Sequence, residues 1–176
     1  MAFVVVQHLD PTHTSLLAEA LSRATAMKVA SAADGTDVEP DHVYVIPPNT
    51  DLALEGNSLR LVPWEKSRKP HLSIDFFFRS LAAERGAQAI GVVLSGSGSD
   101  GTEGLRAIKS EGGITFAQEP KTAAFGYMPQ SAISAGVVDT GMPLAALARE
   151  LVRLSRHPYL SATVRPAASE KEEDSF

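Results

Sequence analysis

Two residues that can move protons follow apolar runs of this sequence. His8 comes after the strand-like AFVVVQ, and Asp100 lies in the glycine-rich GSGSDG that follows AIGVVL. In a parallel α/β sheet, ligands bind beyond the carboxyl ends of the strands. A fold of that kind can bring the imidazole and the carboxylate together as the base and the orienting acid of a serine hydrolase.

A purely structural interpretation of these two residues stays open at this level. A histidine at the end of a strand often only forms hydrogen bonds, and an aspartate in a glycine-rich turn often caps a helix. The spacing of His8 and Asp100 in the sequence does not decide between the structural and the catalytic interpretation.

A metal site is another chemical interpretation of the first stretch. His8, Asp10 and His13 are residue types that bind zinc or another divalent ion. Pro11 interrupts the regular geometry between them, and no further histidine–aspartate pair lies close in the sequence. A solvated or capping role is therefore favoured for His13, and no metal is expected.

The glycines of the second stretch also fit a dinucleotide-binding fingerprint. Gly96, Gly98 and Gly101 match G-x-G-x-x-G between a predicted strand and a predicted helix, and Glu119 follows the next strand. Asp100, however, places a carboxylate in the loop that would bind the pyrophosphate anion. This interpretation is disfavoured, and a tight turn from strand to helix explains the glycines.

The composition excludes several classes of protein. The 176 residues are 44% hydrophobic and 21% charged, and the net charge is −5. This balance disfavours nucleic acid as a partner, and the lack of cysteine excludes disulfides and thiolate metal sites. The sequence has no basic segment ahead of a long apolar run and no stretch of about 18 apolar residues. We therefore expect a cytoplasmic domain without a signal peptide or membrane insertion.

The elements that must position these residues alternate along the chain. Strands are expected at Val4–Val6, Val43–Ile46, Leu52–Glu55, Leu59–Val62, Ala89–Leu94, Ile114–Ala117 and Val137–Val138. Helices are expected at Ser15–Ala24, at Ser73–Arg85, around Leu105 and Ile108, and at Ser131–Ala135. A last helix is expected from Pro143, with Leu144, Leu147, Leu151 and Leu154 on one face.

This order of elements predicts an α/β fold. We expect a doubly wound, mostly parallel sheet with helices on both faces, in a Rossmann-like three-layer arrangement. The strands on either side of Gly56-Asn57 are expected to form one antiparallel hairpin. Residues 1–160 are expected to form the domain, and the polar residues 161–176 a tail or linker.

Four stretches resemble a known family. VVVQHLDPTHTSLL, HVYVIPPNTDL, GVVLSGSGSDGTEGLRAIKSEGG with TFAQ, and MPQSAISAGVVD resemble the chemotaxis protein-glutamate methylesterase domain, the CheB type, over residues 2–154. The QHLDPTH and IPPNTD variants are most similar to forms in which this esterase is fused to a receptor methyltransferase.

The resemblance implies hydrolysis of glutamate γ-methyl esters on chemoreceptors with release of methanol, and related members also deamidate receptor glutamines. It carries the catalytic histidine onto His8 and the catalytic aspartate onto Asp100, and it implies no metal or organic cofactor. The implied partners are methylated cytoplasmic helices of chemoreceptors, with a fused or associated receptor methyltransferase or a histidine kinase. A catalytically silent interaction module of the same fold is the alternative.

The nucleophilic serine of the family has no counterpart in residues 1–176. In the family it lies in a Gly-x-Ser-x-Gly-Gly stretch at the end of the strand before the histidine strand. We therefore expect that a strand–helix unit of about 25–30 residues is missing, that neighbouring strand edges are exposed, and that residues 1–176 alone are inactive. Ser95, Ser97 and Ser99 lie beside Asp100, but the family motif gives none of them a nucleophilic role.

Two further departures lie in the candidate active-site loop. This loop is formed by Gly96, Ser97, Gly98 and Gly101, together with Tyr127 and Met128 from a later segment. Ser97 stands where the family usually has methionine, and Tyr127 stands where it has glycine before Met-Pro. The Tyr127 departure is expected to alter access of the substrate.

Overall fold

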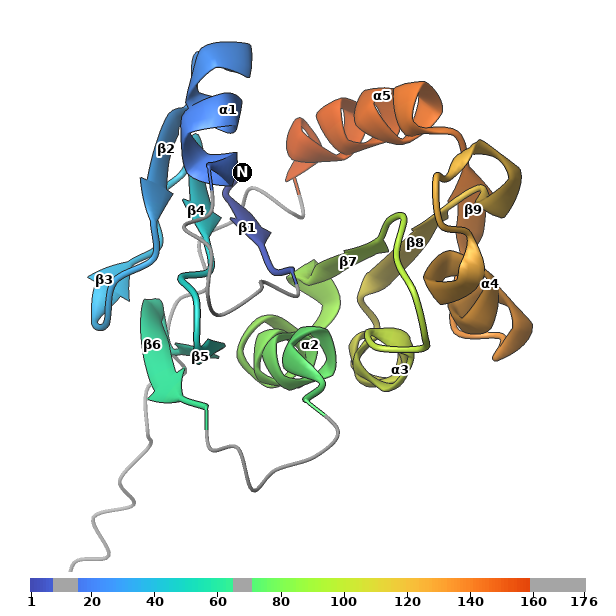
Figure 1. Ribbon diagram of the computed structural model, residues 1–176, viewed down its shortest axis with the longest axis horizontal. Coiled ribbons are helices and arrows are strands. Elements are labelled where there is room, and N and C mark those ends of the chain that lie inside the picture. Colours follow the sequence, from blue (N-terminus) through green and yellow to red (C-terminus); the bar gives the residue numbers. More distant parts are fainter. Residues whose placement is uncertain (8–15, 65–70, 159–176) are drawn as a thin grey trace, which may run out of the picture.

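The computed structural model describes residues 1–7, 16–64 and 71–158 (Figure 1). In chain order its elements are β1 (Phe3–Val5), α1 (Leu17–Ala24), β2 (Lys28–Ser31), β3 (Thr36–Asp37), β4 (His42–Val45), β5 (Thr50–Glu55), β6 (Ser58–Pro63), α2 (Ser73–Arg85), β7 (Ile90–Val93), α3 (Thr102–Ser110), β8 (Ile114–Gln118), α4 (Tyr127–Ser134), β9 (Thr140–Met142) and α5 (Leu144–Ser155). Among these described elements, no helix is both long and apolar enough to cross a membrane.

The parallel strands of the described chain form two sheets. In the first sheet β4 lies between β1 and β2, with Val4 opposite Tyr44. In the second sheet β8 lies between β7 and β9, with Val92 opposite Phe116. The expected α/β fold with mostly parallel strands is confirmed, and its parallel strands are divided between these two sheets.

The expected antiparallel hairpin is also confirmed, and it carries a third strand. β5 and β6 pair with Glu55 opposite Ser58, on either side of the Gly56-Asn57 turn. Gly56 has a φ of +56°, a conformation that glycine adopts without a steric penalty. β3 pairs with the other edge of β6, and β5 packs against α2.

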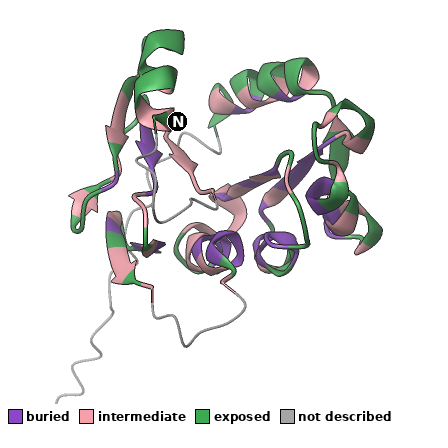
Figure 2. Ribbon diagram, viewed as in Figure 1, coloured by how far each residue is buried: buried purple, intermediate pink, exposed green. Residues whose placement is uncertain are grey.

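Helices cover both faces of the sheet β7–β8–β9. α3 and α4 pack on one face, and α5 lies on the other (Figure 1). Leu105 and Ile108 of α3 are fully buried, while Leu147 and Leu154 of α5 form a smaller cluster with Phe116. Figure 2 shows that buried residues gather on the sides of α2 and α3 and on the central strands. The apolar face of each helix thus decides which side meets the sheet.

Besides β3, two strands differ from the expectations because backbone pairing, and not apolar content, defines them. The last strand is Thr140–Met142, which pairs with β8, so the expected strand at Val137–Val138 is wrong. Val137 instead lies buried in the main core. β2 was not expected, since Lys28–Ser31 has only two partly buried residues and is held by its pairing with β4.

Two helix details also differ. α4 begins at Tyr127, earlier than the expected Ser131, because its first turn follows directly on a loop bound to residues 95 and 96. Leu144 is 52% exposed at the first position of α5, so the apolar contact of that helix is made further along, by Leu147 and Leu154.

Asp139 joins the end of α3 to the middle of the second sheet. Its carboxylate accepts hydrogen bonds from the Lys109 ammonium and from the backbone N–H and hydroxyl of Thr115, both of the latter at 2.9 Å. Burial alone would raise the pKa of Asp139, but these donors together hold it below its usual range.

We expect the contribution of Asp139 to stability to depend on pH. Because its pKa is lowered by folding, the stabilisation is present above the unfolded carboxyl pKa of about 3.9 and is lost as the pH falls through the lower folded value. Asp139→Asn should reduce the free energy of unfolding by about 1 kcal/mol at neutral pH, a figure limited by the partial exposure of the carboxylate. Urea denaturation at pH 7 and near pH 3 measures it; an equal difference at both values would contradict the ionic role.

Candidate functional site

Asp100 is held rigidly in the loop between β7 and α3. The side chain is buried, and Oδ2 accepts the backbone N–H of Ile74 at 3.0 Å. Oδ1 accepts the N–H of Asp75 at 2.9 Å and that of Gly101 at 2.8 Å. Ile74 and Asp75 lie in the first turn of α2, where the partial positive charge of the helix adds to these donors. These three donors therefore hold the carboxylate in one orientation.

The turn that carries Asp100 requires glycine at its end. Gly101 has a φ of +90°, and a Cβ at this position would lie 2.9 Å from a methyl carbon of Val93 and 3.0 Å from one of Ile74. A larger residue at position 101 would therefore displace the backbone next to Asp100. This geometry supports a structural reason for the G-x-G-x-x-G spacing.

The dinucleotide interpretation meets a direct obstacle at the start of α3. The N–H of Gly104, in the first turn of this helix, is already bound by the carboxylate of Asp75 at 2.7 Å. A pyrophosphate at this helix end would meet the carboxylates of both Asp75 and Asp100, so the site disfavours an anion.

The two parts of the expected active-site loop lie together. The N–H of Gly96 donates to the carbonyl oxygen of Phe125 at 2.9 Å, and the N–H of Met128 donates to that of Gly96 at 3.0 Å. A Cβ on Gly96 would lie 2.5 Å from Met128 Cε, so Met128 packs directly on this glycine. Tyr127, which directly precedes Met128 in the sequence, is 75% exposed. Tyr127 and Met128 thus stand beside the loop that leads to Asp100.

The serines of this loop have different surroundings. Ser97 and Gly98 are exposed, and the Gly98 carbonyl accepts the Ser131 hydroxyl at 3.2 Å. The Ser95 hydroxyl accepts the N–H of Phe125 at 2.9 Å, while its own N–H donates to Gln118 at the end of β8. Ser95 therefore ties the end of β7 to its neighbours.

Three of the sequence-predicted residues lie outside the described residues: His8, Asp10 and His13. Their mutual geometry and the pairing of His8 with Asp100 therefore stay predictions. In the parts of the chain that are described, no group of three or more histidine, cysteine, aspartate or glutamate side chains could hold a metal ion.

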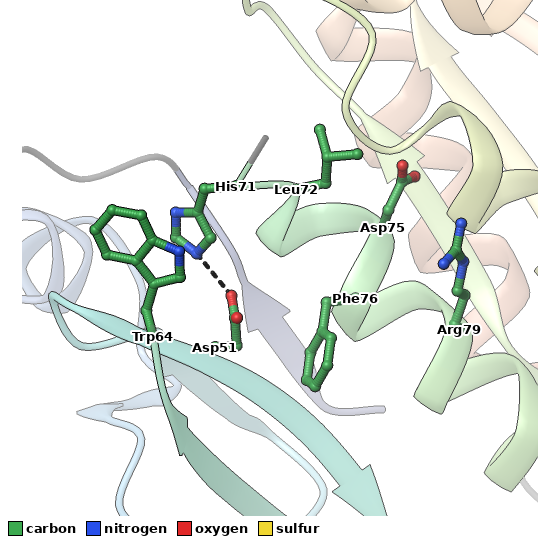
Figure 3. Close-up of a pocket in the computed structure, with 7 residues that line it drawn as sticks. All are labelled: Asp51, Trp64, His71, Leu72, Asp75, Phe76 and Arg79. Atoms are coloured by element: carbon green, nitrogen blue, oxygen red, sulfur yellow. Dashed lines mark hydrogen bonds and ion pairs between the residues drawn. The ribbon is translucent and has the colours of Figure 1, made fainter. Parts of the chain in front are cut away.

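A second polar cluster was not predicted from the sequence. His71 Nε2 and Asp51 Oδ1 are 2.7 Å apart, and the His71 ring stacks on Trp64 with 4.6 Å between centroids (Figure 3). They line a cavity of about 170 Å³ with Phe76 and Arg79. Its residues come from β5, from the position after β6, from the two residues before α2 and from the first half of α2, so no local motif joins them. Asp51 directly precedes the expected strand Leu52–Glu55, so no sequence signal marked this cluster.

Asp75 was also missed as a site residue. It is buried, and its carboxylate reaches α3 while its backbone N–H reaches Asp100. In the sequence it is only an acidic residue in the first turn of a predicted helix, which is a common and usually exposed placement.

Comparisons with known proteins agree with the resemblance. The sequence profile of the CheB methylesterase family matches residues 1–151. The fold is similar to the crystal structure of the Thermotoga maritima CheB methylesterase catalytic domain, with a TM-score of 0.79 and 32% identity over 86% of this chain and 82% of that chain.

Several curated proteins are similar in sequence. A protein-glutamate methylesterase/protein-glutamine glutaminase of Myxococcus xanthus is 36% identical over 87% of this chain and 46% of its own length. An uncharacterized 104.1 kDa protein in the hypE 3' region of Rhodobacter capsulatus is 42% identical over 85% of this chain and 16% of its own length. The chain spans less than half the length of these curated relatives.

Proposed function

Because the chain belongs to the CheB methylesterase family, we propose that it supplies the histidine–aspartate pair of a protein-glutamate methylesterase, with His8 as the base and Asp100 as the orienting acid. The observation that carries this proposal is the Asp100 carboxylate, buried at the carboxyl end of β7 and held by three backbone N–H groups. An acceptor in a fixed direction is what an imidazole needs to keep one tautomer.

The proposed chemistry is acyl transfer through a serine. His8 takes the proton of the serine hydroxyl as the oxygen attacks the glutamate γ-methyl ester, and it returns that proton to the departing methoxide to give methanol. In the second step His8 takes a proton from the attacking water and gives it to the departing serine oxygen, which releases the glutamate. Asp100 accepts the second imidazole N–H and stabilises the imidazolium in both steps. A carboxylate has about four acceptor sites, so it can accept an imidazole N–H as well as backbone donors.

No serine of residues 1–176 matches the family's nucleophile, so we propose that the serine comes from outside these residues. A strand between β1 and β7 would bring it to the carboxyl ends of both. In the described part of the chain, β1 pairs with β4 alone and β7 with β8 alone, which leaves one edge of each available. Parallel strands need partners on such edges, which supports this placement.

The proposed substrates and partners follow from the family. They are the methylated cytoplasmic helices of chemoreceptors, together with a fused or associated receptor methyltransferase or a histidine kinase, and the protein acts in the cytoplasm. Several relatives are named both methylesterase and glutaminase, which supports deamidation as a second activity of the site. The 104.1 kDa relative, of which this chain covers 16%, is compatible with a domain inside a longer chain.

We expect methanol release to depend on His8. The test protein is this chain joined to the serine-bearing strand–helix unit of a relative, with folding checked by circular dichroism. It should release methanol from methylated receptor membranes, and His8→Ala should lower the rate by about 10³-fold or more, because the base is lost. A folded protein without turnover would favour the silent interaction module. Residues 1–176 alone should give no turnover and serve as the control.

A further inference from the structure

α2 and α3 begin side by side, and neither helix is capped by its own N-cap residue. These residues are Leu72 and Gly101, and neither forms a side-chain cap hydrogen bond. The first backbone N–H groups of a helix have no acceptor within the helix itself. In a buried position they need one from elsewhere, because an unpaired buried donor is costly.

Each of the two helices receives a carboxylate from the other. Asp100, which directly precedes Gly101, accepts the N–H groups of Ile74 and Asp75 at the start of α2. Asp75, in that first turn of α2, accepts the N–H of Gly104 in the first turn of α3 at 2.7 Å. Both carboxylates are 3% exposed. The exchange forms a closed set of bonds in which Asp100 is fixed relative to both helices.

The close approach of the helices depends on Gly104. A Cβ at this position would lie 2.5 Å from Phe78 Cβ and 3.1 Å from Asp75 Cα. These are atoms at or next to the backbone of α2, so the contact cannot relax by rotation of a flexible side chain. The absence of a side chain at Gly104 is what lets Asp75 reach its N–H.

The surroundings of Asp75 disfavour its charged form relative to an exposed aspartate. Burial raises its pKa; the neighbouring Asp100 charge adds to that increase, while the Gly104 hydrogen bond and the Arg79 guanidinium oppose it. The result lies above the usual range. The useful property of Asp75 is therefore its acceptor oxygen, which a neutral amide also provides.

We propose that Asp75 is a positioning residue of this site: by capping α3 while its own backbone N–H binds Asp100, it sets the orientation in which Asp100 meets the histidine. The hydrogen bonds among Asp100, Asp75 and Gly104 support the orientation of the Asp100 carboxylate, and its consequence for His8 rests on the proposed function. The Asp75 carboxylate accepts the N–H of Gly104, so we place its effect on the site through Asp100.

NMR titration of residues 1–176 separates position from charge. The side-chain carboxyl carbon of Asp100 is followed against pH in the unmodified chain, in Asp75→Asn and in Asp75→Ala. If Asp75 only repels Asp100, both variants lower the titration midpoint of Asp100, because a negative charge is removed. If Asp75 positions Asp100, Asp75→Asn lowers the midpoint or leaves it unchanged. Asp75→Ala raises it, because without the bond to Gly104 the two helices shift and the backbone N–H groups of Ile74 and Asp75 bind the ionised Asp100 carboxylate less well.

A lower midpoint in Asp75→Ala, equal to that in Asp75→Asn, would overturn the proposal. Asp139→Ala is the control for general loss of stability, and it should leave the Asp100 midpoint in place. If Asp75→Ala does not fold, Asp75→Ser takes its place. The serine side chain is shorter than that of aspartate, so its hydroxyl should not reach the N–H of Gly104.

The His8 imidazole is followed in the same samples. We expect its midpoint to fall in Asp75→Ala and to be restored in Asp75→Asn. A raised Asp100 midpoint with an unchanged His8 midpoint would support the positioning of Asp100 and contradict the His8–Asp100 pair. The two proposals therefore fail in different ways.

Discussion

Replacing Asp100 with alanine is expected to lower the free energy of unfolding of residues 1–176 by about 3 kcal/mol. The N–H groups of Ile74 and Asp75 would lose their acceptor inside the protein, at about 1–3 kcal/mol for each buried donor. Loss of the repulsion between Asp100 and Asp75 offsets part of this cost. The total free energy of unfolding of a protein domain is usually about 5–15 kcal/mol, so a loss of this size is large.

Urea denaturation followed by circular dichroism measures this change. Asp100→Asn keeps one acceptor oxygen and should lose about half as much stability. Glu103→Ala removes an exposed carboxylate of α3 and should change stability by less than about 0.5 kcal/mol. An Asp100→Ala variant as stable as Glu103→Ala would mean that the carboxylate does not cap α2.

Substitution of Gly104 by alanine is expected to destabilise the domain by about 2–3 kcal/mol. The added methyl would lie 2.5 Å from Phe78 Cβ, so α2 and α3 must separate. Alanine would otherwise stabilise a helix by about 1 kcal/mol relative to glycine, so the sign of the effect distinguishes packing from propensity.

The same substitution should disturb the carboxylate exchange. Separation of the helices lengthens the bond from Gly104 to Asp75 and shifts the amide resonance of Ile74, which reports the bond to Asp100. Thermal unfolding and amide spectra measure both effects. A more stable Gly104→Ala variant with an unchanged Ile74 resonance would show that the helices do not touch at this point.

Local patterns predicted the elements that carry strong periodicity. α2 runs from Ser73 to Arg85 as expected, because its apolar residues recur at helical spacing and Gly86, with a φ of +50°, ends it. The hairpin around Gly56 was also predictable from its turn residues. β2 and β9 were not, since each depends on a partner strand distant in the sequence.

The site was predictable only where a motif is continuous in the sequence. Asp100 lies in a glycine-rich turn after a buried strand, and the sequence shows that placement directly. The role of Asp75 depends on how closely α2 and α3 approach, which a contact between Gly104 and Phe78 decides. No spacing in the sequence reports an approach of two helices, so residues of this kind emerge only from the fold.

NMR titration of the His8 imidazole measures whether His8 pairs with Asp100. In residues 1–176 such a pair predicts that Asp100→Asn lowers the midpoint of this titration by about one pH unit or more, because an anionic acceptor is replaced by a neutral amide. Glu103→Ala should leave the midpoint unchanged. Equal midpoints in the unmodified chain and in a folded Asp100→Asn variant would show that Asp100 does not orient His8, and the proposed esterase site would then be wrong.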